Sequence, residues 1–190
     1  IEGNAVEHMV HAGINVHDTH DALVHRNVIR QLRGGTGGIY VEDGNEINNT
    51  ISENVALCMS NPFICGVGIY IIGMTNKFLD NRVGGYAIAA YTNGGGSGQG
   101  PASGLSCPIH TKFQQFRRNV LHDSTRWGLY LGNLDVRNPQ QDENGFVRDR
   151  GTCGEFTPTG EYNGANPATV VEDTIVYNGG ASGAYFLAGV

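Results

Sequence analysis

The 190-residue sequence lacks three features that define common classes of protein. No stretch carries a convincing helical period of apolar residues, which argues against a helical fold. No apolar run is long enough to cross a bilayer. The formal net charge is −6, and the only basic cluster is Arg117-Arg118, so nucleic-acid binding is not expected. We therefore expect a β-rich segment that neither inserts into a membrane nor binds nucleic acid.

Cysteine is scarce, and its spacing argues against a zinc site. The four cysteines contain no CxxC pair, which zinc sites commonly use. All four fall in or beside inserted loops, and an even number in loops favours disulfides formed in an oxidising compartment. Of the three possible pairings we favour Cys58–Cys65 with Cys107–Cys153. An extracellular location is the expectation that follows.

Metal-binding signatures are also missing. Five of the seven histidines lie within residues 8–25, where Asp18 and Asp21 could help them to hold a transition metal, but no HxH or HExxH motif is present. Calcium at Glu42, Asp43 and Glu46 would lack the spacing of an EF-hand. Solvated or stacked histidines are the favoured interpretation, so we expect no metal and no cofactor. The histidines concerned are His8, His11, His17, His20 and His25.

What the sequence does contain is a repeat. An apolar residue, two further residues, Asn or Thr and another apolar residue recur five times. Each phrase precedes a short apolar strand that usually opens with glycine. The first apolar residues are Val24, Ile51, Phe78, Phe116 and Val171, and the polar ones are Asn27, Asn54, Asn81, Asn119 and Thr174. The glycines are Gly13, Gly38, Gly68, Gly128 and Gly183, with Gly85 opening a looser copy. A unit of this length that recurs along the chain indicates stacked copies of one structural unit.

Short strands joined by tight turns predict an all-β fold, a right-handed parallel β-helix of about five to six coils. The first apolar residue of each phrase should stack inside, and the asparagines should form a hydrogen-bonded ladder at a corner. We expect a single domain over residues 1–190, with two long inserted loops at about 93–110 and 133–167. Since the chain begins at Ile1 without an initiator Met, it is expected to be a piece of a longer chain or a polymerising unit.

The run from Gly37 to Asn54 resembles a segment in the β-helix of a family of large extracellular proteins. The family includes the cell-migration-inducing hyaluronan-binding protein, the transmembrane cell-surface hyaluronidase and the fibrocystin-like receptors. In that family a glycine-led apolar strand leads into Glu-Asp-Gly, then Glu, then Asn-Thr, and here these are residues 42–44, Glu46 and residues 49–50. Residues 14–24, 126–131 and 167–171 are also similar. The resemblance implies a parallel β-helix, extracellular placement and a role with glycans such as hyaluronan.

Catalysis has one candidate patch. Aligning Gly13 with Gly38 places His17 over Glu42, and glycan-cleaving β-helices commonly place carboxylates on neighbouring coils. Glu42, Asp43 and His17 are therefore candidate catalytic residues of a polysaccharide hydrolase. The alternative, in which residues 43–44 form a turn and Glu42 caps exposed backbone, is the favoured one.

Two further kinds of site follow from the repeat. Tyr40, Tyr70 and Tyr130 occupy the same place in their coils and should form one column, which could bind glycans or could simply pack the strands. Tyr86, Tyr91 and Trp127 would extend this platform if they faced outward. Asn48 opens the glycosylation sequon Asn-Asn-Thr.

Three functions remain open. The first is an extracellular scaffold or glycan-binding module of a cell-surface or matrix protein. The second is a hyaluronidase-like hydrolase module. The third is a subunit of an extracellular filament, assembled end to end through open coil ends. The expected partners are polysaccharides, glycoprotein glycans or further copies of the chain.

Overall fold

A computed structural model describes residues 1–17, 19–30, 37–41, 46, 48–58, 65–71, 76–93, 114–132 and 170–186. Both long loops predicted from the sequence lie outside the described residues, except for Asn93.

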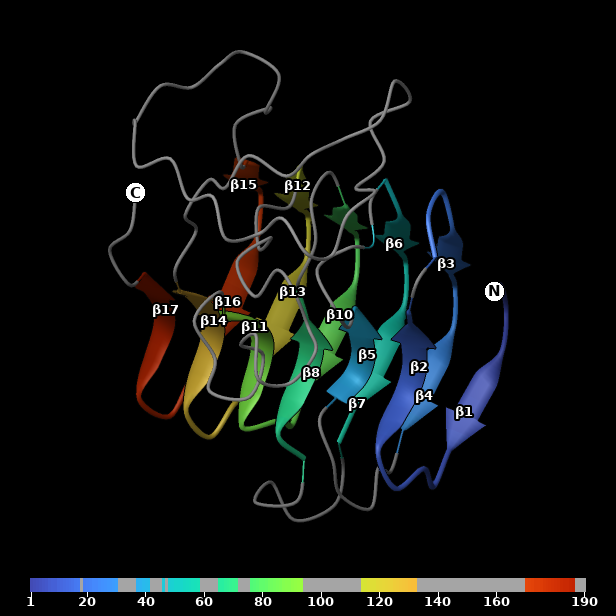
Figure 1. Cartoon of the computed structure of the whole chain (residues 1–190). Coiled ribbons are helices and arrows are strands. Elements are labelled where there is room, and N and C mark those ends of the chain that lie inside the picture. Colours follow the sequence, from blue (N-terminus) through green and yellow to red (C-terminus); the bar gives the residue numbers. More distant parts are fainter. Residues whose placement is uncertain are drawn as a thin grey trace, which may run out of the picture.

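All strands of the described residues pair in parallel and form three sheets, here called A, B and C (Figure 1). Sheet A contains β3 (Leu23–His25), β6 (Thr50–Ser52), β9 (Lys77–Leu79), β12 (Gln115–Arg117) and β15 (Val170–Glu172). Sheet B contains β1 (Ala5–Glu7), β4 (Val28–Arg30), β7 (Val55–Leu57), β10 (Arg82–Gly84), β13 (Val120–His122) and β16 (Ile175–Tyr177). Sheet C contains β2 (Ala12–Val16), β5 (Gly37–Val41), β8 (Val67–Tyr70), β11 (Ile88–Asn93), β14 (Trp127–Gly132) and β17 (Ser182–Phe186).

Each coil passes through sheets A, B and C in that order, and the next coil stacks on it. In Figure 1 the strand colours accordingly run from blue at one end of the stack to red at the other. Five coils contain all three strands, and β1 and β2 form part of a sixth at the N-terminal end. This is a parallel β-helix, which confirms the fold class predicted from the repeat. Within the described residues, no helix is long and apolar enough to cross a membrane.

The interior of the coils contains the predicted apolar stack. The residues are paired in register between neighbouring strands of sheet A, and the rings of Phe78 and Phe116 lie 6.3 Å apart between centroids. All are fully buried except the last, Val171, which is 36% exposed because no described coil lies beyond it. The stack is Val24, Ile51, Phe78, Phe116 and Val171. A single coil could not bury such residues, so the stacking itself creates the core.

The corner between sheets A and B has the same backbone conformation in every coil. The residue before each Asn or Thr of the repeat has a positive φ, for example 53° at Glu53 and 57° at Asp80. This left-handed conformation is unfavourable for residues with a Cβ, so the structure around it must compensate. The residues are Gly3, Arg26, Glu53, Asp80, Arg118 and Asp173.

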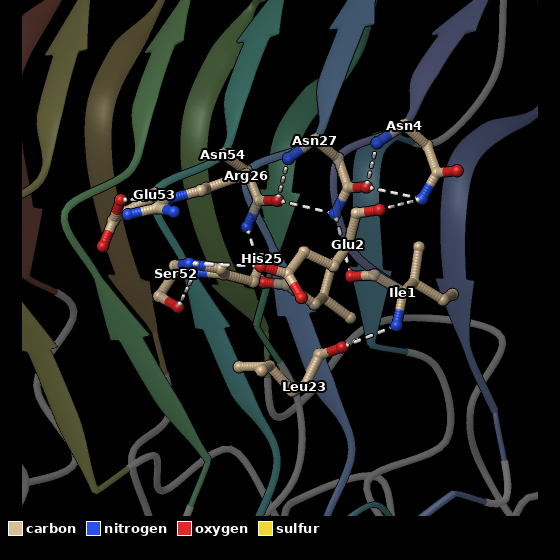
Figure 2. A network of polar contacts seen from close by, with 11 residues as sticks. Ile1, Glu2, Asn4, Leu23, His25, Arg26, Asn27, Ser52, Glu53 and Asn54 are labelled. Carbon is tan, nitrogen blue, oxygen red and sulfur yellow. Dashed lines mark hydrogen bonds and ion pairs between the residues drawn. The ribbon is translucent and has the colours of Figure 1, made fainter.

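The compensation comes from the predicted asparagine ladder, part of which is drawn in Figure 2. Asn27 donates both its backbone N–H and its side-chain amide to Oδ1 of Asn54, each over 3.0 Å. Asn54 repeats the pattern toward Asn81, and its amide also donates to the Val24 carbonyl over 2.9 Å. The ladder runs through Asn4, Asn27, Asn54, Asn81 and Asn119, of which the last four are fully buried. The structural interpretation of these asparagines is therefore confirmed.

A second, shorter ladder stands at the corner that leads into sheet A, and it was not foreseen. Asn49 donates its backbone N–H and its amide to Oδ1 of Asn76, and it accepts from the Ala22 N–H over 2.8 Å. Its amide also donates to the Thr19 carbonyl. The signal was present, because Asn49 and Asn76 are separated by 27 residues, as are Asn27, Asn54 and Asn81 of the first ladder.

Glycine recurs where sheet C comes closest to sheet B. A Cβ on Gly38 would lie 2.7 Å from the Gly68 carbonyl and 2.7 Å from the Tyr86 hydroxyl, so a side chain has no room there. The position is occupied by Gly13, Gly38, Gly68, Ala89, Gly128 and Gly183. Lack of space in the core thus explains the glycine at Gly13, Gly38, Gly68 and Gly128, whereas Gly183 has room for a Cβ.

Candidate functional site

The most regular feature of the described surface is a column of tyrosines on sheet C, here called the tyrosine column. Tyr40 pairs in register with Tyr70, and both were predicted to share one column with Tyr130. The structure confirms this and adds two members that the sequence reasoning did not place in the column, Tyr91 and Tyr185. The column therefore spans five consecutive coils, from β5 to β17.

Strand alternation points the tyrosine column away from the core. Ile39 and Val41 are both fully buried in the core, so Tyr40 between them faces the opposite side of sheet C. Neighbouring rings lie against one another, with centroids 4.7, 5.5, 5.0 and 5.1 Å apart from Tyr40 to Tyr185. These separations fall within the range of favourable aromatic pairs, and the spacing of parallel strands sets them.

Access to the column increases toward its C-terminal end. Tyr40 is only 9% exposed, whereas Tyr185 is 39% exposed and the three tyrosines between them are partly buried. Burial raises the pKa of Tyr70 and, to a smaller extent, that of Tyr91. A phenol is protonated at physiological pH even at its ordinary pKa, so these hydroxyls can donate hydrogen bonds.

Trp127 widens the accessible end of the column. Its ring centroid lies 5.0 Å from that of Tyr130 and 5.8 Å from that of Tyr185. The three rings together are here called the aromatic cluster. The prediction that Trp127 extends the platform agrees with this position, because all three rings are in mutual contact.

Tyr86 does not belong to this face, so its assignment to the platform was wrong. Its ring is buried in the core, burial raises the pKa of its phenol, and its hydroxyl has no hydrogen-bond partner among the described residues. The reason is an error of alignment. The repeat pattern predicts a glycine-led strand that opens at Gly85, but Gly85 lies in the preceding turn with φ of 78°, and Ile88 pairs with Val67.

The catalytic candidates are only partly described. Val16, the last residue of β2, pairs with Val41, the last residue of β5. His17 and position 42 therefore come directly after paired residues of neighbouring coils, as the alignment of Gly13 with Gly38 predicted. His17 is exposed. Glu42 and Asp43 themselves lie outside the described residues, so hydrolysis by this patch stays a prediction. Glu46, the next acidic residue, is fully buried.

No three His, Cys, Asp or Glu side chains gather into a metal-binding group in the part of the chain that the structure describes. Several histidines instead make pairwise contacts between or within coils. His25 Nδ1 lies 2.9 Å from the Ser52 hydroxyl. His122 Nδ1 lies 2.7 Å from Asp123, and this hydrogen bond, with a second one from Asn178, holds the pKa of Asp123 below its usual value.

One predicted disulfide is present. Cys58 and Cys65 are bonded across the connection between β7 and β8, as the sequence reasoning favoured. The other proposed pair, Cys107 and Cys153, lies outside the described residues.

The predicted glycosylation residue is sterically accessible. Asn48 is exposed, has φ of 57° at a corner, and donates a hydrogen bond to Asp21 one coil away. Secretion from a eukaryotic cell should therefore give a glycan at Asn48, seen as a mass decrease on treatment with peptide N-glycosidase. Thr50→Val should abolish the glycan and Thr50→Ser should retain it, because only a hydroxyl completes the sequon. A secreted chain of unmodified mass would contradict the assignment.

Comparison with known proteins agrees with the β-helix. Residues 1–68 match the family model described as CEMIP beta-helix. Human fibrocystin-L is 23% identical over 139 residues, which are 69% of this chain and 3% of that protein. Mouse fibrocystin-L is 24% identical over 139 residues, with the same shares of each chain. No solved structure matches this chain.

The chain spans only 3% of the length of these curated relatives, so nothing about the activity of the whole relatives passes directly to it. The match to the family model includes Glu42-Asp43-Gly44, the most specific part of the resemblance seen in the sequence. The stacked parallel coils described above are the fold that this resemblance implies. The chain therefore resembles the β-helix of the family that includes the cell-migration-inducing hyaluronan-binding protein and the fibrocystin-like proteins.

Proposed function

We propose that this chain is an extracellular β-helix scaffold of a cell-surface or matrix protein, and that the tyrosine column of sheet C binds glycan chains. The observation that carries the proposal is the unbroken column of five ring-on-ring tyrosines, open at the aromatic cluster. Exposed apolar patches commonly mark binding sites, and the accessible end of the column, where Tyr185 is exposed, is such a patch.

The chemistry of the column suits sugars. Pyranose rings present C–H groups on one face and hydroxyls at the edge, so they contact aromatic rings and hydrogen-bond to phenols at the same time. The array repeats at the spacing of parallel strands, about 4.8 Å. A ligand that contacts several of its rings must therefore itself be extended and repetitive, which is a property of polysaccharides.

The disulfide and the resemblance support the extracellular part of the proposal. The Cys58–Cys65 bond is of a kind that persists in oxidising compartments. The family that this chain resembles is one of large extracellular proteins with roles in glycan recognition. The rigid stack of coils would hold the tyrosine column at a fixed geometry, which is what a scaffold contributes to binding.

Truncation of the accessible end of the column should weaken glycan binding. Tyr185→Ala is expected to reduce affinity for a bound oligosaccharide about tenfold, the effect of losing one well-packed aromatic contact. Binding is measured on an array of polysaccharides and then by titration calorimetry with the best ligand. Tyr177→Ala is the matched control, because Tyr177 is also an exposed tyrosine of a last-coil strand but lies on sheet B. Equal losses in both variants, or no binding of any glycan, would contradict the proposal.

End-to-end self-association stays an alternative proposal, and the register predicts a repulsive contact within it. One outer column of sheet A runs through Glu2, His25, Ser52, Leu79, Arg117 and Glu172. Continuation of the stack into a second copy would place Glu172 of one chain beside Glu2 of the next. Two like charges at neighbouring strand positions are unfavourable, so this arrangement ranks below glycan binding.

A further inference from the structure

Charge is distributed unevenly over the three sheets. Not one strand of sheet C contains Asp, Glu, Lys or Arg on either face. Sheets A and B carry all the charged residues of the described strands, namely Glu7, Arg30, Lys77, Arg82, Arg117 and Glu172. The strands of sheet C have 4 to 6 residues and those of sheets A and B have 3, so a shorter length does not account for the absence of charge in sheet C.

The positions beside the tyrosine column are also uncharged. A second line of paired residues runs parallel to the column at the start of each strand, through Ala12, Gly37, Val67, Ile88, Trp127 and Ser182. At its accessible end Trp127 touches Tyr130 and Tyr185, so this line and the column form one continuous surface there. Among the described strands, a ligand on this surface would meet aromatic rings, aliphatic groups and hydroxyls but no ionised side chain.

This composition selects between two classes of polysaccharide. A polyanion such as hyaluronan carries repeated carboxylates, and proteins hold such groups with Lys or Arg in charge-assisted hydrogen bonds. The strands of sheet C supply no such group, and the formal net charge of the whole chain is −6. A neutral polysaccharide needs no cation, because ring stacking and hydrogen bonds from protonated phenols satisfy it.

We infer that the ligand of the sheet C face is an uncharged polysaccharide, lying along the axis of the β-helix across successive coils, and not a polyanion. The inference rests on the proposed function and specifies its substrate class. It differs from the hyaluronan that the family resemblance implies.

The test compares neutral and anionic oligosaccharides of equal length on the whole chain. Cellohexaose, laminarihexaose and chitohexaose represent the neutral class, and a hyaluronan hexasaccharide represents the anionic class. Each is titrated by saturation-transfer NMR and calorimetry at about 0.05 M and about 0.5 M NaCl, since salt screens charge interactions over this range. Disaccharides of each series report whether several coils take part.

Binding of a neutral hexasaccharide with an affinity that changes less than twofold with salt is the expected result. The disaccharide should bind at least tenfold more weakly, because it reaches fewer rings. Trp127→Ala should lower the affinity about tenfold and Tyr185→Phe should lower it less, since the second variant keeps the ring and removes only the hydroxyl. Tyr177→Ala should leave the affinity unchanged, and thermal melts of each variant show whether it remains folded.

Two outcomes would overturn the inference in distinguishable ways. Salt-sensitive binding of the hyaluronan hexasaccharide, lost in Trp127→Ala and absent for all neutral ligands, would keep the glycan-binding function and reject the uncharged ligand. Absence of binding for every oligosaccharide of both classes, with folded protein, would reject the proposed function itself.

Discussion

Asn54→Ala is expected to lower the free energy of unfolding by about 3 kcal/mol or more, because the substitution breaks the ladder at its centre. The side-chain Oδ1 of Asn54 accepts two hydrogen bonds from Asn27, and the side-chain amide of Asn54 donates to the Val24 carbonyl and to Oδ1 of Asn81. All of these groups are buried, so removal of the amide leaves donors and an acceptor without a partner and without water. Chemical denaturation followed by circular dichroism measures the change.

The N-terminal member of the same ladder is the matched control. Asn4 donates its backbone N–H and its side-chain amide to Oδ1 of Asn27 in the same way, but Asn4 is exposed. Water can therefore replace the hydrogen bond that is lost with its side-chain amide. Asn4→Ala should therefore cost less than about 1 kcal/mol. A loss of less than about 1 kcal/mol for Asn54→Ala as well would show that the corner is held by its backbone alone and that the ladder adds nothing.

Gly68→Ala is expected to destabilise the protein by about 3 kcal/mol or to prevent folding, since overpacking of a rigid core has costs of this order. The added Cβ would overlap the Val83 side chain and would lie 2.5 Å from the Ala89 carbonyl. Neither neighbour can move freely. Val83 is fully buried in β10, and the Ala89 carbonyl belongs to β11, the next strand of sheet C. The thermal midpoint and the yield of folded protein report the effect.

Gly183 occupies the position equivalent to Gly68 in the last described coil and provides an internal comparison. A Cβ on Gly183 would meet only Val176 at 3.7 Å, which is ordinary van der Waals contact. Gly183→Ala should therefore be neutral or slightly stabilising, by restricting the unfolded chain. Equal destabilisation by the two substitutions would mean that glycine is required for its backbone and not for the space that it leaves.

The parts of the fold that could be predicted are those that repeat in the sequence itself. The spacing of Asn27, Asn54 and Asn81 predicted the ladder, and the residues three positions before them predicted the interior stack. The common place of Tyr40, Tyr70 and Tyr130 after a glycine predicted the column. In each case residues of the same type occupy equivalent positions in successive coils, so the sequence repeat alone is sufficient to predict that they stack.

The parts that could not be predicted are those where a coil departs from the pattern. The third coil has Ala89 where the others have glycine, and the nearest glycine that fits the pattern is Gly85. An alignment on Gly85 omits Tyr91 from the column and places Tyr86 on the surface, although Tyr86 fills the core beside Gly38 and Gly68. Only the pairing of Ile88 with Val67 reveals the true register. The catalytic candidates Glu42 and Asp43 belong to no repeat, so neither the pattern nor the described coils decide their role.

The asparagine ladder ends one coil before the described strands do, and this makes the coils unequal in the order in which they open. At the next corner Thr174 replaces Asn, and its hydroxyl donates to the Glu172 carbonyl of its own coil instead of to a neighbour. The last coil is attached there through main-chain bonds such as that from the Ile175 N–H to the Asn119 carbonyl, and its apolar residues are the most exposed of their stacks. Within the described segment, the last two coils are therefore expected to separate at this corner more easily than the coils that the asparagine ladder joins.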